Sequence, residues 1–115
     1  MSETVKFWEI KGQIRILGVD DGPFEFGEGN KALLVGTVFR GGQWLDAVLR
    51  SEVEVDGDDG TEKIIGMVTR SRHRGQIRVV MTDGLTLGGF NVIDGAEIFR
   101  RTGLPVISVT REAPT

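Results

Sequence analysis

The sequence predicts an α/β domain in which helices pack on a mixed five-stranded sheet, with the elements in the order βββαβαβ. Five short, mostly apolar segments have the length of strands, and two segments carry apolar residues at helical spacing. The first three strands are expected to form an antiparallel meander. The last two follow helical crossovers and are expected to be parallel. A length of 115 residues without an internal repeat or linker indicates one domain, residues 1–115.

The first three predicted strands are joined by turns. Residues 14–19 (IRILGV) are an apolar run that ends at the turn sequence DDGPF, and residues 32–39 (ALLVGTVF) form a second buried run. Residues 44–55 alternate between apolar and polar side chains, as in a strand with one exposed face. The sequence RGGQ between the second and third runs predicts a hairpin.

The first predicted helix follows an acidic turn. Asp59 and Glu62 have the spacing of a capping box, and an apolar helical face comes directly after them. This face consists of Ile64, Ile65, Met67 and Val68. Residues 77–84 then form the fourth strand, a buried one.

The second predicted helix follows the glycine-containing loop LTLGGF. Asn91 is expected to cap this helix, which is expected to extend to about Arg101. Its apolar face is expected to consist of Val92, Ala96 and Phe99. Gly103 and Pro105 end the helix, and residues 104–110 form the last buried strand.

The composition excludes several classes of protein. With 39% hydrophobic and 27% charged residues the chain is not wholly disordered, and no apolar run approaches the ~18 residues of a transmembrane helix. The N-terminal residues lack the apolar segment of a secretory signal, and the absence of cysteine excludes disulfides and thiolate metal sites. We expect a cytoplasmic protein without membrane contact. The 17 glycines indicate tight turns or close backbone approaches.

Charge is unevenly distributed along the chain. The net charge of −3 argues against a generally basic nucleic-acid binder. Six acids and no base lie between residues 52 and 62, whereas four arginines and the only histidine lie between residues 69 and 78. The basic segment is compatible with phosphate contacts and with an exposed helix C-terminus, and composition favours the second interpretation. The candidate phosphate contacts are Arg70, Arg72, His73 and Arg74.

Two aspartates follow predicted buried strands directly. Asp20 comes at the end of the first strand and Asp83 at the end of the fourth. If these strands are adjacent and parallel, the two carboxylates lie side by side at the sheet edge where open α/β sheets bind ligands. The acidic turn that contains Asp59 and Glu62 could close on the same place. Carboxylates from three segments would form an oxygen-rich site suited to Mg²⁺ or Mn²⁺.

Ordinary turn and packing chemistry competes with these assignments. Aspartate is common in turns and at helix caps, and this interpretation is favoured for Asp21, Asp56 and Asp58. The segment LTLGGFN is compatible with a phosphate-binding turn, but a tight strand-to-helix connection explains most of its composition. Packing is favoured over base stacking for the aromatic residues Phe7, Trp8 and Trp44.

Five segments together resemble the endonuclease V-like family of archaea, also called endonuclease dU. They are RILGVDDGPF, VGTVFRGGQWLDAVL, VDGDDGTEKI, SRHRGQIRVVMTDGLTLGGFNVID and TGLPVISVTR, and the resemblance runs from about Ile14 to Arg111. It implies a ribonuclease H-like fold with the strand order 3-2-1-4-5. It also implies a divalent-metal-dependent endonuclease of the DNA repair type. Such an enzyme hydrolyses nucleic acid with deaminated bases (uracil or hypoxanthine), in DNA rather than RNA.

The resemblance also implies roles for individual residues. Endonuclease V is similar in having GVD at the end of its first strand and a DG turn after its fourth, which implies Asp20 and Asp83 as catalytic metal ligands. A third acid would fall within VDGDDGTE, where Asp58, Asp59 and Glu62 are the candidates. The pocket for the deaminated base would be formed by the segment that includes Gly84, Leu85, Gly88, Gly89 and Asn91.

The chain departs from this family in one respect. Relatives usually continue for a further helical region, whereas this chain stops at Thr115, so the domain is expected to be C-terminally short and one sheet face to lack cover. A homodimer could cover that face. The alternative function is a non-catalytic ribonuclease H-like module that binds nucleic acid or a protein partner. A nucleotide phosphate binder that uses LTLGGFN is a third, less favoured hypothesis.

Overall fold

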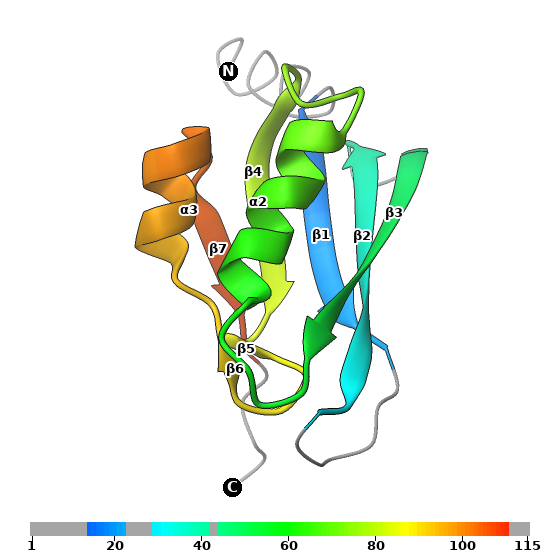
Figure 1. Cartoon of the computed structure of the whole chain (residues 1–115). Helices are drawn as coiled ribbons and strands as arrows, with labels where there is room; N and C mark the ends of the chain where they lie inside the picture. Colours follow the sequence, from blue (N-terminus) through cyan, green and yellow to red (C-terminus); the bar gives the residue numbers. More distant parts are fainter. Residues whose placement is uncertain (1–13, 23–28, 42–43, 111–115) are drawn as a thin grey trace, which may run out of the picture.

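Five strands of the protein form one mixed sheet in the order β3-β2-β1-β4-β7 (Figure 1). The computed structural model describes residues 14–22, 29–41 and 44–110. β2 is antiparallel to both β1 and β3, whereas β4 is parallel to both β1 and β7. The predicted α/β class, antiparallel meander and strand order are therefore confirmed. The strands are β1 (Arg15–Asp21), β2 (Lys31–Arg40), β3 (Trp44–Glu54), β4 (Ile77–Asp83) and β7 (Val106–Val109).

Two helices, α2 (Gly60–Arg70) and α3 (Gly95–Thr102), lie side by side on one face of the sheet (Figure 1). The predicted apolar face of α2 is buried and packs on alternate residues of the strands, whose side chains point to this face. Gly36 of β2 makes room for the helix, because a Cβ there would lie 2.8 Å from Met67 Sδ. The core under α2 includes Leu17, Val19, Leu34, Val38, Ile64, Ile65, Met67 and Val68.

The other face of the sheet has no helix on it among the residues that the structure describes. The strand register places Val48, Thr37, Gly18, Met81 and Ile107 in one row across this face. Val48 and Ile107 are 60% and 50% exposed. We call this surface the bare face, and its exposed large apolar side chains are Leu45, Val48, Ile107 and Val109.

The second helix begins later than the sequence predicts. α3 starts at Gly95, and Asp94 caps it by accepting a hydrogen bond from the backbone N of Glu97 at 3.0 Å. The prediction that Asn91 caps this helix is wrong, because Asn91 and Val92 form the short strand β6 (Asn91–Val92). The chain therefore makes one more turn before the helix starts.

The predicted apolar face of this helix is wrong as well. Val92, Ala96 and Phe99 are exposed, whereas Ile98 is fully buried. The end of the helix is as predicted: Gly103 has a φ of 76°, and its backbone N donates to Phe99 O at 2.8 Å. A left-handed residue at this position favours glycine.

The predicted glycine loop LTLGGF contains a short antiparallel hairpin of β5 (Thr86–Leu87) and β6. Gly88 and Gly89 at its tip have φ values of 54° and 84°, which glycine adopts without a steric penalty. No helix in the described part of the chain is long and apolar enough to cross a membrane.

Candidate functional site

Asp20 and Asp83 lie at the same end of neighbouring parallel strands. Val19 of β1 is the register partner of Thr82 in β4, so the next residue of each strand, an aspartate, lies across one strand spacing of ~4.8 Å. Both aspartates line one cavity of about 340 Å³. The sequence places Asp20 just beyond the first strand, whereas in the structure β1 extends through it to Asp21. The adjacency predicted from the topology is present.

The cavity opens on the bare face and is mainly apolar away from the carboxylates. Gly18 lies in the row of the bare face, and a Cβ at this position would meet Phe39 Cε1 and Thr37 Oγ1, both at 3.3 Å. The absence of a side chain on Gly18 leaves this part of the cavity open. Besides the two aspartates, the lining consists of Gly18, Val19, Val35, Thr37, Met81, Thr82 and Val109.

The electrostatics at the cavity rim oppose negative charge. Partial burial raises the pKa of Asp20 above its usual value, and the negative charges of Asp21 and Asp83 add to the rise. The backbone N of Asp21 donates to Asp20 Oδ1 at 2.8 Å, which lowers the pKa and partly offsets the effect. A cation between the carboxylates would favour their ionised forms, because it would replace repulsion by attraction.

Two other acids at this end bind backbone groups. Asp21 Oδ2 accepts a hydrogen bond from Gly88 N at 2.7 Å, and Asp56 Oδ1 accepts one from Phe90 N at 2.8 Å. These bonds attach the tip of the β5–β6 hairpin to the ends of β1 and β3. Asp21 and Asp56 therefore have the structural role that turn chemistry favours.

Asn91 joins this hairpin to the start of α2. Its Oδ1 accepts from Gly60 N at 2.8 Å, and its Nδ2 donates to Glu54 O at 2.9 Å and to Asp59 Oδ1 at 2.7 Å. The side chain is fully buried, so it presents no surface to a ligand. Asp59 itself makes no side-chain cap to α2, contrary to the predicted capping box, and Asn91 supplies that cap instead.

The predicted third acids do not join the pair. Asp59 Oδ1 also accepts from Glu54 N at 3.1 Å, and Glu62 forms an ion pair with Arg101 of α3. In residues 14–22, 29–41 and 44–110, no group of three or more His, Cys, Asp or Glu side chains is arranged to hold a metal ion. The described part of the site thus offers two carboxylates, Asp20 and Asp83.

The turn after Asp83 contains an exposed apolar residue, two positions beyond this acid in the chain. Gly84 has a φ of 82°, and its O accepts a hydrogen bond from Thr82 Oγ1 at 2.8 Å. Its N donates to Val109 O at 3.0 Å, so both neighbouring strands hold the turn. Leu85 is 61% exposed. Of the predicted pocket residues, these two lie nearest to the acids in the chain.

The predicted phosphate contacts are separated from the acid pair. Arg70 ends α2, and Arg72, His73 and Arg74 lie in the turn between α2 and the start of β4. Asp83 is at the other end of β4, six residues beyond Ile77, or about 20 Å away along the strand. His73 is half-buried, with its Nδ1 3.5 Å from Gln76 Oε1. The structure therefore divides the predicted site residues between two ends of the sheet.

The predicted packing of the aromatic residues can be compared with the structure for Trp44 only. Trp44 is 64% exposed, so the preference for a packed position is wrong. Phe90, which the sequence does not single out, is 76% exposed at the hairpin tip. Phe7 and Trp8 lie outside the described residues. No periodicity in the sequence distinguishes Trp44 from a buried strand residue, because its exposure depends on which elements reach this end of the sheet.

Most of the chain matches one known protein family. Residues 12–115 match the family described as endonuclease dU. The chain belongs to the endonuclease dU family. A UPF0215 protein of Methanothermobacter thermautotrophicus is 62% identical over 112 residues, which are 97% of this chain and 55% of that protein. This chain thus spans about half the length of the curated relatives it matches.

Solved structures share the fold of this endonuclease dU family member. A protein of unknown function from Archaeoglobus fulgidus matches with a TM-score of 0.77 and 41% identity, over 89% of this chain and 56% of that one. Endonuclease V of Ciona intestinalis, crystallised with a 24mer DNA containing an inosine followed by a ribo-adenosine, matches with a TM-score of 0.61 over 100% of this chain and 60% of that one. At 10% identity, the second match shows the fold alone. The predicted endonuclease V-like fold is confirmed.

Proposed function

We propose that this member of the endonuclease dU family is a divalent-metal-dependent endonuclease that cuts nucleic acid containing a deaminated base, uracil or hypoxanthine, in DNA repair. The observation that carries the proposal is the pairing of Asp20 and Asp83 on adjacent parallel strands at the rim of one cavity. Family membership supports the choice of reaction, as does the fold shared with an endonuclease V that was crystallised with inosine-containing DNA.

The chemistry of the two carboxylates fits Mg²⁺ or Mn²⁺. Mg²⁺ is commonly held by one or two carboxylates, with water and substrate phosphate as the other ligands. Asp20 and Asp83 would supply the carboxylate ligands in this proposal. When bound, such an ion lowers the pKa of a coordinated water and neutralises phosphate charge.

The turn after Asp83 supports a role in base recognition. Leu85 is exposed, and Gly84 keeps the backbone beside it free of a side chain. A base taken out of the stack packs against apolar or aromatic side chains, and this turn carries an exposed leucine two residues after Asp83. We assign contact with the deaminated base to Gly84 and Leu85, with DNA preferred over RNA.

The test is cleavage of labelled oligonucleotides that contain uracil, hypoxanthine or neither, with Mg²⁺, Mn²⁺ or EDTA. We expect metal-dependent cutting of the strands with a deaminated base, and loss of cutting in Asp20→Asn and Asp83→Asn. Glu52→Gln is the matched control, because Glu52 is an exposed carboxylate of β3, two strands away from Asp20 and outside the cavity. Cleavage that persists in both acid variants, or wild-type protein that is inactive with both metals, would contradict the proposal.

A non-catalytic binding module is the second candidate, and the bare face is the observation that favours it. Its exposed apolar side chains, such as Val48 and Ile107, are typical of interaction surfaces. This function predicts metal-independent binding of nucleic acid or protein, and a homodimer in which two bare faces meet. A dimer mass in light scattering together with inactive protein would favour the module over the nuclease.

A further inference from the structure

The end of the molecule opposite to Asp20 and Asp83 carries a cluster of arginines. Arg70 is the last residue of α2, Arg72 and Arg74 lie in the following turn, and Arg78 is near the start of β4. All four side chains are in exposed residues. We call this surface the basic end. It contrasts with the net charge of −3 of the whole chain.

Three of the four arginines of the basic end donate hydrogen bonds to backbone carbonyl oxygens, which do not neutralise their charge. Arg70 Nη2 donates to Arg50 O at 2.5 Å, and Arg74 Nη1 donates to Thr69 O at 3.0 Å. Arg78 Nη1 donates to a backbone O as well, that of Gly75, at 2.9 Å. Carbonyl acceptors carry no net charge, and among the described residues no carboxylate lies within ion-pair distance of the four. Their positive charges therefore remain available to an anion.

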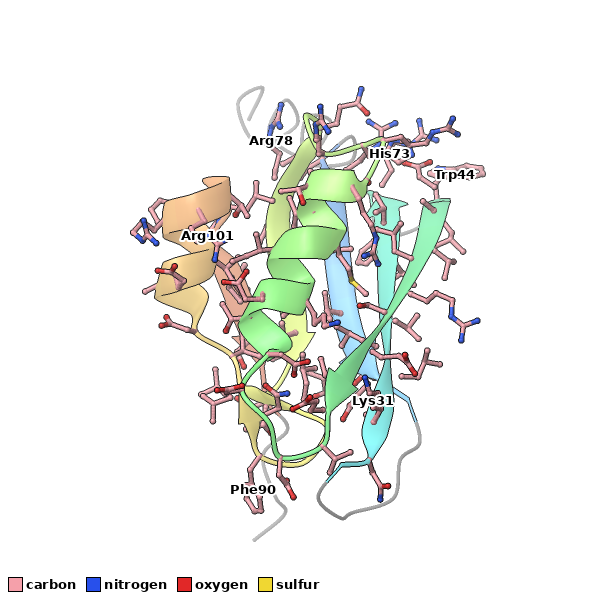
Figure 2. The ribbon with its side chains drawn as sticks, in the orientation of Figure 1. Lys31, Trp44, His73, Arg78, Phe90 and Arg101 are labelled. Carbon is pink, nitrogen blue, oxygen red and sulfur yellow. The ribbon has the colours of Figure 1, made fainter. Side chains whose placement is uncertain are left out.

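An exposed indole lies at the same end. Trp44 pairs in register with Arg40 of β2, Arg40 with Arg15 of β1, and Arg15 with Ile77 at the start of β4. Figure 2 shows Trp44, His73 and Arg78 at one end of the molecule and Phe90 at the other. A side chain that is 64% exposed leaves the ring free for contact with a ligand.

We propose that the basic end binds single-stranded nucleic acid, with the four arginines contacting backbone phosphates and Trp44 stacking on an unpaired base. A single small anion would need guanidinium groups that converge on one point, whereas these are spread from the C-terminus of α2 to the start of β4. A charged strand with bases on one side matches a surface of spread arginines beside an aromatic ring. This binding needs neither metal nor the acid pair, so it goes beyond the proposed cleavage.

The basic end lies far enough from the acid pair that one short stretch of nucleic acid cannot contact both. The length of β4 separates the basic end from Asp83 by about 20 Å, which is the rise of about six stacked nucleotides at 3.4 Å each. A strand bound at the basic end can therefore reach the acid pair only if it extends several nucleotides further.

The experiment measures fluorescence anisotropy of a labelled 15-nucleotide single strand in EDTA, over a range of salt concentrations. For the wild type we expect log K against log salt to have a slope of about −3, because each of four phosphate contacts contributes roughly −0.7. Arg72→Glu/Arg74→Glu should lower the magnitude of the slope by about 1.4 and weaken binding by about tenfold or more at low salt. Trp44→Ala should weaken binding about 5- to 150-fold, and Trp44→Phe should restore most of it.

Lys31→Glu/Lys63→Glu is the matched control, because Lys31 begins β2 and Lys63 lies in the first turn of α2, both at the end opposite to the basic end, and the change in net charge is the same. We expect it to bind close to wild type, and circular dichroism should show all variants folded. Equal losses in the two double variants, or a wild type that does not bind, would overturn the proposal. Binding that depends on Arg72, Arg74 and Trp44 in a protein that cuts nothing would support the basic end and contradict the nuclease. Cleavage by the wild type together with unchanged binding in the basic-end variants would support the nuclease and contradict the basic end.

Discussion

Replacing Asn91 with alanine should destabilise the protein strongly, because one buried amide connects the hairpin, β3 and α2. The change removes three hydrogen bonds, to Gly60 N, Glu54 O and Asp59 Oδ1. At roughly 1 kcal/mol for each net hydrogen bond, the free energy of unfolding should fall by about 3 kcal/mol. That is a large part of the roughly 5–15 kcal/mol typical of a domain, and Gly60 N would be left buried without this acceptor.

Urea unfolding followed by far-ultraviolet circular dichroism measures this change. With a slope of about 1–3 kcal/mol per molar urea, the midpoint should fall by roughly 1–3 M. Asn91→Asp tests the contact with Asp59 separately, because it keeps the acceptor for Gly60 N but places a second carboxylate against Asp59. The added carboxyl should have a raised pKa in the folded state, so its cost should be greater at pH 8 than at pH 5.

A double-mutant cycle identifies the contact itself. A Cβ on Gly60 would lie 2.8 Å from Asn91 Oδ1, so Gly60→Ala should cost less in the Asn91→Ala background than in the wild type. A loss below about 1 kcal/mol for Asn91→Ala, or strict additivity with Gly60→Ala, would refute the reasoning.

Further substitutions test the core, the second helix and the acid pair. Gly66→Ala should stabilise the protein by about 0.5–1 kcal/mol, because a Cβ there meets no atom within 4 Å and alanine favours the helix. Gly36→Ala should cost about 1–3 kcal/mol because it crowds Met67, and equal urea midpoints for the two alanine variants would contradict this. Asp94→Ala should cost about 1 kcal/mol by removing the α3 cap, and an unchanged midpoint would show that the cap is dispensable. Asp20→Asn should raise the melting temperature in EDTA at pH 7, because a raised pKa means that the ionised form opposes folding. The gain should shrink as the pH falls through the folded-state pKa, and a lower melting temperature at pH 7 would contradict it.

Much of the fold could be predicted because it depends on local periodicity and on general rules of connection. Short apolar runs identify four of the strands, alternation identifies β3, and the helical crossovers make β4 and β7 parallel to β1. The adjacency of Asp20 and Asp83 follows once the first and fourth strands are neighbours, which the family resemblance implied and the structure shows. The start of α3 was mispredicted because Asn91 satisfies the local pattern of a cap, while its actual partner, Gly60, lies 31 residues away in the chain.

The functional assignments depend more on tertiary structure. Sequence alone determined the mixed sheet and the aspartates at the ends of its first and fourth strands, because these follow from residue spacing and strand direction. The strand order that makes those two strands neighbours was implied by the family resemblance. Only the folded chain decided that Asp59 binds backbone and amide groups, and that Arg70, Arg72 and Arg74 lie a strand's length from Asp83. The physical reason is that these relations depend on contacts between elements far apart in the chain, which a local pattern of residue types does not contain.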